Sequence, residues 1–266
     1  MTNIFISVVL LLLTLLIDVL SKVSPLSSKE LIQRNLNNVY IASLVGISSA
    51  YLYQSIEDDK QYSRLHESLF SKYIKKDANI LEIGFGNSYG ANLDYYKGDN
   101  RIVGLDPAID INDTTKINNV KRKYSDRNIS LQLMKGSAEN INYASDSFDV
   151  IVSTLVFCTI DDPIKALREC SRVLKKGGLL LCIDHILSDD DSFLAYQQKL
   201  LSPLQEMVAD GCHLNRRTDL LFEQFTRSNN DHDNNDILFD KILSLEYFTI
   251  NSQWPICRQI SAVLQK

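Results

Sequence analysis

The chain has little of what metal-binding and disulfide-rich proteins require. Its 266 residues include five cysteines and four histidines, and no two cysteines form a Cys-x-x-Cys pair. Scattered residues of this kind carry neither the spacing of a zinc site nor a disulfide framework. The sequence therefore predicts no metal site, and it predicts reduced thiols in a domain that faces the cytosol.

An excess of positive charge is also absent. The chain has 28 Lys and Arg against 33 Asp and Glu, which gives a net charge of −5. Nucleic-acid-binding domains carry a basic patch or stripe. The one small basic cluster, Lys121-Arg122-Lys123, is interpreted as the solvated face of a helix. We therefore expect no nucleic-acid partner.

The one long, strongly apolar run lies near the N-terminus. Twelve of the fourteen residues from Ile4 to Ile17 are apolar. Each favours membrane insertion by roughly 0.3–0.6 kcal/mol. A signal peptide is the alternative, but no Lys or Arg precedes the run as it would in one. We predict a transmembrane anchor over residues 1–21.

A second apolar stretch, Val39 to Tyr53, includes serines and a glycine and falls short of the ~20 residues needed to span a bilayer comfortably. Residues 22–56 are therefore predicted to be a basic linker followed by an interfacial or membrane helix. The cations of this linker, Lys22, Lys29 and Arg34, favour a cytosolic location for it by the positive-inside tendency. One span with a cytosolic catalytic domain is favoured over a hairpin of two spans.

Apolar strands alternate with amphipathic helices from residue 79 onward, after a helix-prone segment at 57–78. This alternation predicts an α/β fold, a Rossmann-like doubly wound and mostly parallel sheet, in a domain of residues 57–266. A polar run at 228–236 is predicted to be a loop, and the segments on either side of residue 253 a C-terminal antiparallel strand pair. The expected strands are 79–84, 101–106, 129–134, 148–154, 178–184, 237–250 and 256–264, and the expected helices are 88–97, 113–125, 162–174 and 192–209.

A glycine-rich turn follows the first of these strands, in the stretch from Ile80 to Gly90. Gly84 and Gly86 allow the backbone to approach a ligand closely. A helix N-terminus after such a turn attracts polar and anionic groups. Asp106 ends the next apolar run, where a carboxylate can accept hydrogen bonds from a ribose diol. On these residues alone, a dinucleotide-binding fold fits as well.

Three later motifs follow in order, Gly136–Ile141, Asp146–Val152 and Arg172–Gly178. With the glycine turn and Asp106, they resemble class I S-adenosylmethionine-dependent methyltransferases of the methyltransferase type 11 kind. The resemblance covers residues 79 to 186. It implies S-adenosylmethionine as the methyl donor, bound by Glu82, Gly84, Phe85, Gly86, Asp106, Pro107, Ser137, Ala138, Thr154 and Leu155.

Two departures from the family pattern accompany this resemblance. Ser137 stands where the family often has an acid that recognises the adenine amine, and Asn87-Ser88-Tyr89 lengthen the glycine loop by about two residues. These departures leave room for a non-catalytic, cofactor-binding assembly factor in place of an enzyme.

Scattered residues extend the resemblance to a membrane-anchored group that methylates alkyl thiols at the endoplasmic reticulum and lipid droplets. They include Leu155–Thr159, Asp184-His185, Asp210–Leu214 and Trp254. The resemblance implies a small lipophilic acceptor, with a thiol favoured, at the endoplasmic reticulum membrane. The alternative is a quinone- or phenol-type C- or O-methyltransferase of the mitochondrial inner membrane. The oligomeric state is not predicted.

A methyl sulfonium is already activated, so its transfer requires alignment more than a base. His185, just after the fifth strand, is the candidate general base, and a structural histidine is the alternative. His213 and Asp184 are weaker candidates. Cys158 is interpreted as a small packed residue and not as a nucleophile.

Overall fold

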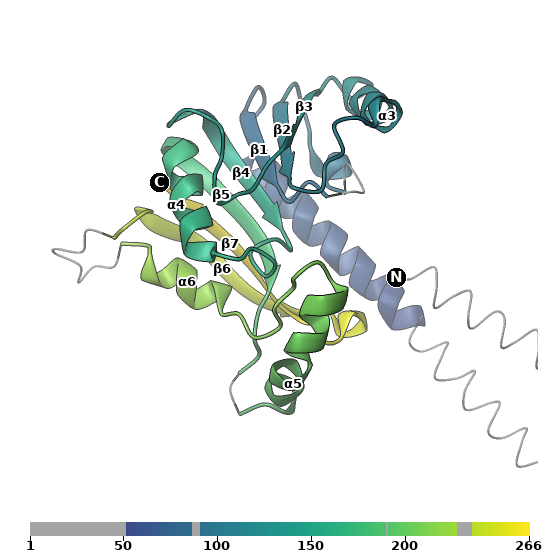
Figure 1. Ribbon diagram of the computed structural model, residues 1–266, viewed down its shortest axis with the longest axis vertical. Helices are drawn as coiled ribbons and strands as arrows, with labels where there is room; N and C mark the ends of the chain where they lie inside the picture. Colours follow the sequence, from purple (N-terminus) through teal and green to yellow (C-terminus); the bar gives the residue numbers. More distant parts are fainter. Residues whose placement is uncertain (1–51, 87–90, 190, 228–235) are drawn as a thin grey trace, which may run out of the picture. The chain divides into compact units, whose positions relative to one another are not determined.

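The computed structural model describes residues 52–86, 91–189, 191–227 and 236–266 (Figure 1). The predicted anchor over 1–21, nearly all of the 22–56 segment, the extra loop residues at 87–89 and the polar run at 228–235 lie outside them. Among the described residues, none of the helices combines the length and the apolar character that a membrane crossing needs. Residues from Lys60 onward form one compact unit.

Seven strands form a single sheet in the order β3-β2-β1-β4-β5-β7-β6 (Figure 1). Strands β1 to β5 are parallel, whereas β7 is antiparallel to β5 and β6 is antiparallel to β7. The predicted Rossmann-like sheet with its C-terminal antiparallel pair is thus confirmed. The bounds are β1 Asn79–Ile83, β2 Arg101–Asp106, β3 Ser130–Lys135, β4 Phe148–Thr154, β5 Leu174–His185, β6 Lys241–Thr249 and β7 Arg258–Gln265.

Helices cover both faces of the sheet and bury a core on each. Alternation along β1 sends Leu81 to one core and Ile80 to the other. The first core also contains Leu167 and Phe222, and the second contains Phe70 and Tyr124. These residues come from α4 (Pro163–Val173) and α6 (Thr218–Gln224) in the first case, and from the helix at 52–73 and α3 (Thr114–Ser125) in the second.

Helix α3 carries the basic cluster on its solvent-facing side. Asp113 begins the helix, and its side chain accepts the Lys116 N–H at 2.9 Å, as expected of an N-cap residue. Val120 and Tyr124 face the core. Residues 121–123, between these two, are all exposed, which confirms their interpretation as a solvated helix face.

Helix α4 begins as predicted. The Asp162 carboxylate accepts the Lys165 N–H at 2.9 Å, and Pro163 occupies the first turn. The helix ends at Val173, one residue before its predicted end, and β5 begins at Leu174 instead of the predicted residue 178. The reason is strand pairing, because Leu174 already pairs with Phe148 of β4.

The predicted helix at 88–97 is wrong over its described part. That part contains only a short 3-10 turn, Leu93–Tyr95. Asn92 and Tyr96, on either side of the turn, hydrogen-bond to the buried Glu82, and this tertiary contact outweighs the weak local preference for an α-helix. Helix α6 is an addition that the sequence analysis did not predict, since its seven residues are too few to show a helical period.

Candidate active site

The strand order places the site at the switch point between β1 and β4. From β1 the chain continues to β2 on one side, and β4 lies on the other. Doubly wound sheets bind ligands outside the carboxyl ends of the strands at such a point. A surface hollow of about 410 Å³ lies at the opposite edge, where it is lined by Asn79, Arg101 and Phe148 at the amino ends of their strands. It is therefore not the candidate site.

The backbone of the turn after β1 is exposed, and buried side chains hold the turn in place. Gly84 and Gly86 have φ of +68° and +69°, the left-handed region that favours glycine. A Cβ on Gly84 would lie 2.2 Å from Val156 Cγ2. The Phe85 ring is buried, and a Cβ on Gly104 would lie 2.6 Å from it. A fixed turn with an open glycine backbone suits close contact with a ligand.

Asp106, at the end of β2, holds this turn. Its Oδ2 accepts the Gly86 N–H at 2.9 Å and its Oδ1 accepts the Ala108 N–H at 2.7 Å. The carboxylate is half-buried, and Pro107 beside it is exposed. Each carboxylate oxygen has a second lone pair. The arrangement therefore fits a ribose diol that donates to Asp106 next to the glycine turn.

Glu82 supports the turn from inside the protein. It is buried, and its two oxygens accept hydrogen bonds from Asn92 Nδ2 at 2.9 Å and from the Tyr96 hydroxyl at 2.7 Å. Burial raises the pKa of Glu82 to about 7, although the hydrogen bonds from Tyr96 and Asn92 lower it. These contacts fit a role of Glu82 in ordering the loop, and a hydrogen bond to the amine of the methionine is the other role that the resemblance implies. Asn92 and Tyr96 were not predicted from the sequence, because no spacing pattern marks them.

Ser137 and Ala138 lie just after β3. The Ser137 Oγ accepts the Glu139 N–H at 3.1 Å, and Ala138 is buried. Glu139 Oε1 accepts the Asp162 N–H at 2.6 Å. Glu139 is thus occupied at the start of α4. Ser137, which is half-buried, remains the residue whose hydroxyl is predicted to face the adenine edge.

The end of β4 supplies the last two residues of the predicted cofactor site. Thr154 Oγ1 accepts a hydrogen bond from Asn92 Nδ2 at 3.2 Å, so Asn92 joins Thr154 to Glu82. Leu155 has a φ of +55°, and its N–H donates to the Ile183 carbonyl at 2.8 Å. Both residues are half-buried at the carboxyl edge of the sheet.

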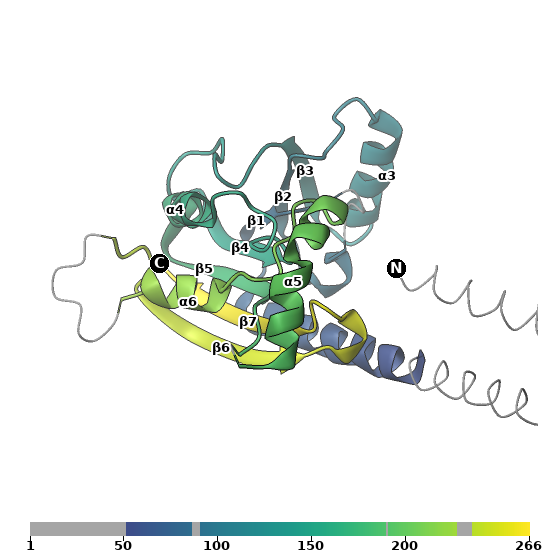
Figure 2. The same ribbon diagram turned by 60° about the horizontal axis from the view of Figure 1, so that its bottom comes forward.

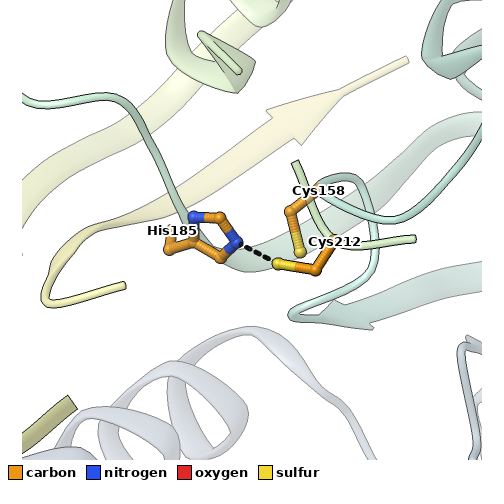
Figure 3. A group of neighbouring side chains, drawn as sticks. All are labelled: Cys158, His185 and Cys212. Atoms are coloured by element: carbon orange, nitrogen blue, oxygen red, sulfur yellow. Dashed lines mark hydrogen bonds between the residues drawn. The ribbon is translucent and has the colours of Figure 1, made fainter. Parts of the chain in front are cut away.

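Beyond Leu155, three side chains from distant parts of the sequence meet (Figure 3). Cys158 follows β4, His185 ends β5 and Cys212 follows α5 (Phe193–Val208). The His185 Nε2 lies 3.0 Å from the Cys212 Sγ. The three ligand-type atoms lie within 4.8 Å of one another, and all three residues are buried. His185 is thus at the predicted edge, but one ring nitrogen already contacts a thiol.

The electrostatics of this cluster favour charge separation. Burial lowers the pKa of His185, but the hydrogen bond to Cys212 and the charge of Asp184 outweigh it and raise this pKa overall. Hydrogen bonds from Cys158 and His185 lower the pKa of the Cys212 thiol despite its burial. Burial raises the pKa of Asp184 to about 6. The cluster can therefore hold a Cys212 thiolate beside a His185 imidazolium.

Hydrogen bonds hold the Cys158 segment against the loop that carries Cys212. The His213 N–H donates to the Cys158 carbonyl at 2.8 Å, and the Arg216 guanidinium donates to the Phe157 carbonyl at 2.5 Å. The His213 Nδ1 lies 2.8 Å from the Glu206 carboxylate on α5. The contact with Glu206 holds His213 in place, and with it the loop that carries Cys212.

Comparisons with known proteins agree with this geometry. Residues 81–182 match the family described as "Methyltransferase domain". The chain is 31% identical to thiol S-methyltransferase TMT1B of Rattus norvegicus over 183 residues, 67% of this chain and 71% of that protein. The chain belongs to the TMT1 methyltransferase family. It is also 30% identical to thiol S-methyltransferase TMT1A of Homo sapiens over 142 residues, 53% of this chain and 56% of that protein.

Solved structures show the same fold. The YcgJ protein of Bacillus subtilis has a TM-score of 0.51 at 16% identity, and the likeness covers 76% of this chain and 99% of that one. This TMT1-family protein is therefore an S-adenosylmethionine-dependent methyltransferase, and S-adenosylmethionine is its methyl donor. The resemblance found in the sequence is confirmed.

Helix α5 gives this TMT1-family protein an exposed apolar face next to the cluster. Gln198 fixes the helix, because its side chain accepts the Ser188 N–H at 2.8 Å and donates to the Ile186 carbonyl at 3.1 Å. Figure 2 shows α5 along its length. Six large apolar side chains of the helix are exposed, and we call them the α5 stripe: Phe193, Tyr196, Leu200, Leu204, Met207 and Val208.

Proposed function

We propose that the protein transfers the methyl group of S-adenosylmethionine to the sulfur of a small lipophilic thiol at a membrane surface. The observation that carries this proposal is the match to TMT1B of Rattus norvegicus, a thiol S-methyltransferase by name, over 71% of its length. The match to the methyltransferase family at residues 81–182 includes the glycine turn, β4 and most of β5, which are the parts that would align donor and acceptor.

The chemistry needs few side chains. The acceptor sulfur attacks the methyl carbon, the bond from that carbon to the sulfonium sulfur breaks, and the electron pair stays on the cofactor sulfur. The thiol proton goes to solvent. Alignment of this kind contributes roughly 7–11 kcal/mol. A thiol with a pKa of about 8.5 already supplies a few per cent thiolate at neutral pH, so His185 need not act as a base.

The α5 stripe supports the lipophilic and membrane parts of the proposal. Met207 is 83% exposed and Phe193 is 75% exposed. Amphipathic helices bury such faces at the interface of a bilayer. The stripe belongs to the helix that fixes the loop of Cys212, so a lipid-dissolved acceptor would have a short path to the site. With the predicted anchor over 1–21, this favours a catalytic domain on the cytosolic face of a membrane, and the resemblance to the thiol-methylating group makes the endoplasmic reticulum the proposed one.

The test uses the full chain in lipid nanodiscs with S-adenosylmethionine that carries an isotopically labelled methyl group. The acceptors are an alkyl thiol and, as a matched control, the alkyl alcohol of the same length. We expect a labelled thioether from the thiol and no ether from the alcohol, because an alcohol has almost no anion at neutral pH. Mass spectrometry identifies the products.

Phenol and quinone acceptors complete this test. Label on a phenol oxygen or a quinone ring carbon, without a thioether, would replace the thiol proposal with the ring-methylating alternative. Binding of S-adenosylmethionine without any methylated product would point to a non-catalytic assembly factor. Imaging of the tagged full chain against endoplasmic reticulum and mitochondrial markers tests the proposed location separately.

A further inference from the structure

We infer that Cys158, His185 and Cys212 bind one zinc-type metal ion, and that this ion takes the sulfur of the acceptor in its fourth coordination position. The first part, the metal site, stands on the cluster itself. The second part, the role in catalysis, rests on the proposed thiol acceptor.

The donor set and its spacing suit zinc. Two thiolate sulfurs and one imidazole nitrogen are ligands that zinc prefers. Around a tetrahedral ion with bonds of about 2.3 Å to sulfur and 2.0–2.1 Å to nitrogen, neighbouring ligand atoms lie roughly 3.4–3.8 Å apart. The observed contact from His185 Nε2 to Cys212 Sγ is 3.0 Å, and no pair in the group exceeds 4.8 Å. Side-chain shifts of under an ångström would complete the geometry.

Two buried polar atoms next to the cluster lack hydrogen-bond partners, and one of them belongs to a carboxylate whose charge favours a nearby cation. Within the described part of the chain, Asp184 Oδ2 and His185 Nδ1 are buried and have no hydrogen-bond partner. Buried polar atoms without partners are rare and indicate an ion, a water or a ligand. A dication on the other ring nitrogen would also offset the charge of the fully buried Asp184.

The protein holds the ligands before an ion arrives. Cys158 is fixed through its carbonyl by the His213 N–H, His185 by its place at the end of β5, and Cys212 by its N–H donating to the Ala209 carbonyl at 2.9 Å. The other buried cysteines do not share this setting; Cys170, for example, is on α4 and packs into the apolar core. Among the described residues the group offers three ligands, and a zinc site of three protein ligands keeps one position open for catalysis.

The open position gives the ion a defined role. The thiol of the acceptor binds the ion and loses its proton to solvent, as a coordinating thiol does. The metal-bound sulfur then attacks the methyl carbon, and the carbon–sulfonium bond breaks with its electron pair left on the cofactor sulfur. The product is a neutral thioether, a weaker ligand than a thiolate, so it dissociates.

Metal binding is measured first, without reference to activity. The purified full chain is equilibrated with Zn²⁺ alone against a competing chelator, and with Co²⁺ to observe a thiolate-to-metal absorption band. We expect one equivalent of Zn²⁺ in the wild type. Cys158→Ser, His185→Ala and Cys212→Ser should each bind about 100-fold more weakly or worse and lose the band, because each removes a ligand.

Cys257→Ser is the matched control. Cys257 is also a buried free cysteine, but it is not in the ligand group, so this variant should bind Zn²⁺ as the wild type does. Binding of S-adenosylmethionine to every variant, measured by calorimetry, shows that each is folded. Wild-type protein without stoichiometric zinc, a Cys158–Cys212 disulfide in place of the ion, or zinc retained in the cysteine variants would overturn the metal site.

Activity then tests the catalytic part. Removal of zinc should abolish methylation of the alkyl thiol, zinc should restore it, and binding of S-adenosylmethionine should not change. Undiminished thiol methylation without zinc would overturn the role of the ion and leave the proposed function in place. A third outcome is that the protein binds stoichiometric zinc but methylates a phenol or a quinone and not the thiol. This outcome would contradict both the proposed function and the catalytic role of the ion, while the metal site itself would stand.

Discussion

The two halves of the candidate site are built in different ways. The cofactor half, from the glycine turn to Asp106, uses backbone atoms and one carboxylate from two consecutive strands. The cluster half uses the side chains of Cys158, His185 and Cys212, which come from three segments separated by other elements. The first half can be recognised from local sequence, whereas the second exists only when the sheet and α5 bring those segments together.

This difference has a physical reason. Close approach of the backbone to a cofactor requires glycines, and a ribose requires an acid one strand later, so this half leaves a pattern in the local sequence. Binding of the acceptor requires side chains at particular positions in space. Any loop at the carboxyl edge of the sheet can supply such side chains. Substitutions in one half should therefore leave the other half unaffected. The expected effects decrease from Asp106 to the α5 stripe.

The largest effect is expected at Asp106, in the cofactor half. Asp106→Ala removes the acceptor of the Gly86 and Ala108 N–H groups and the predicted ribose ligand. Hydrogen bonds to a charged group are worth about 1.5–3 kcal/mol each, so kcat/KM should fall about 100-fold or more. Zinc binding by the cluster half should not change.

Asp94→Ala is the control, because it removes an exposed carboxylate that pairs with Arg127 on the surface. Titration calorimetry with S-adenosylmethionine and a methylation assay measure both variants. Wild-type affinity for the cofactor in Asp106→Ala would contradict the assignment of this half.

The glycine turn should be the next most sensitive position. Gly84→Ala forces a side chain into the left-handed region, at about 1–2 kcal/mol, and places its Cβ 2.2 Å from Val156 Cγ2, which adds about 1–3 kcal/mol of overpacking. Gly177→Ala is matched, since its φ is +74° but the nearest atom lies at 3.9 Å. Urea denaturation should show a loss of about 2–5 kcal/mol for Gly84→Ala and about 1–2 kcal/mol for Gly177→Ala.

A second substitution separates the two costs at Gly84. Val156→Ala removes the methyl groups that the new Cβ would meet, so Gly84→Ala should cost less in that background than in the wild type. Equal costs in both backgrounds would show that the turn moves away from Val156.

Glu82 should make the free energy of unfolding depend on pH. Its pKa is raised from 4.5 to about 7, so the folded state binds the proton more tightly than the unfolded state. Stability from this group is present below pH 4.5 and is lost as the pH rises through 7, by about 3 kcal/mol at most.

Glu82→Gln should remove this part of the slope, because the amide does not ionise. Asp184 shifts in the same direction, so the informative quantity is the wild-type slope minus the variant slope in cofactor-free protein between pH 4.5 and 7. If the free energy of unfolding had the same pH slope in the wild type and in Glu82→Gln, Glu82 would be ionised in the folded protein over this pH range.

The smallest effect is expected on the outside of the cluster half. Trp254 is the single tryptophan of the chain, it is exposed, and its Nε1 donates to Gln197 of α5 at 3.2 Å. If the α5 stripe lies in a bilayer interface, spin-labelled lipids should quench its fluorescence in nanodiscs. Leu200→Ser with Leu204→Ser should reduce this quenching.

The control for the stripe is Leu220→Ser with Leu243→Ser, which changes two exposed leucines away from α5 and should leave the quenching as in the wild type. Methylation of a water-soluble thiol should stay unchanged in both pairs. If the two double variants were quenched to the same extent, the α5 stripe would not contact the membrane.

The sequence alone determined the order of the strands along the chain, the α4 start at Asp162 and the cofactor half. These features depend on hydrophobic period, capping and glycine, which act within a few residues. The methyl donor was implied by the resemblance of the ordered motifs to class I methyltransferases, and comparison with relatives confirms it.

Only the tertiary structure decided the rest. It replaced the predicted helix at 88–97 with a 3-10 turn over the described residues, because Asn92 and Tyr96 bind a buried carboxylate. It also turned two scattered cysteines and a histidine, which by spacing predict no metal, into a buried ligand group. Spacing along the chain cannot report contacts that depend on how β4, β5 and α5 pack.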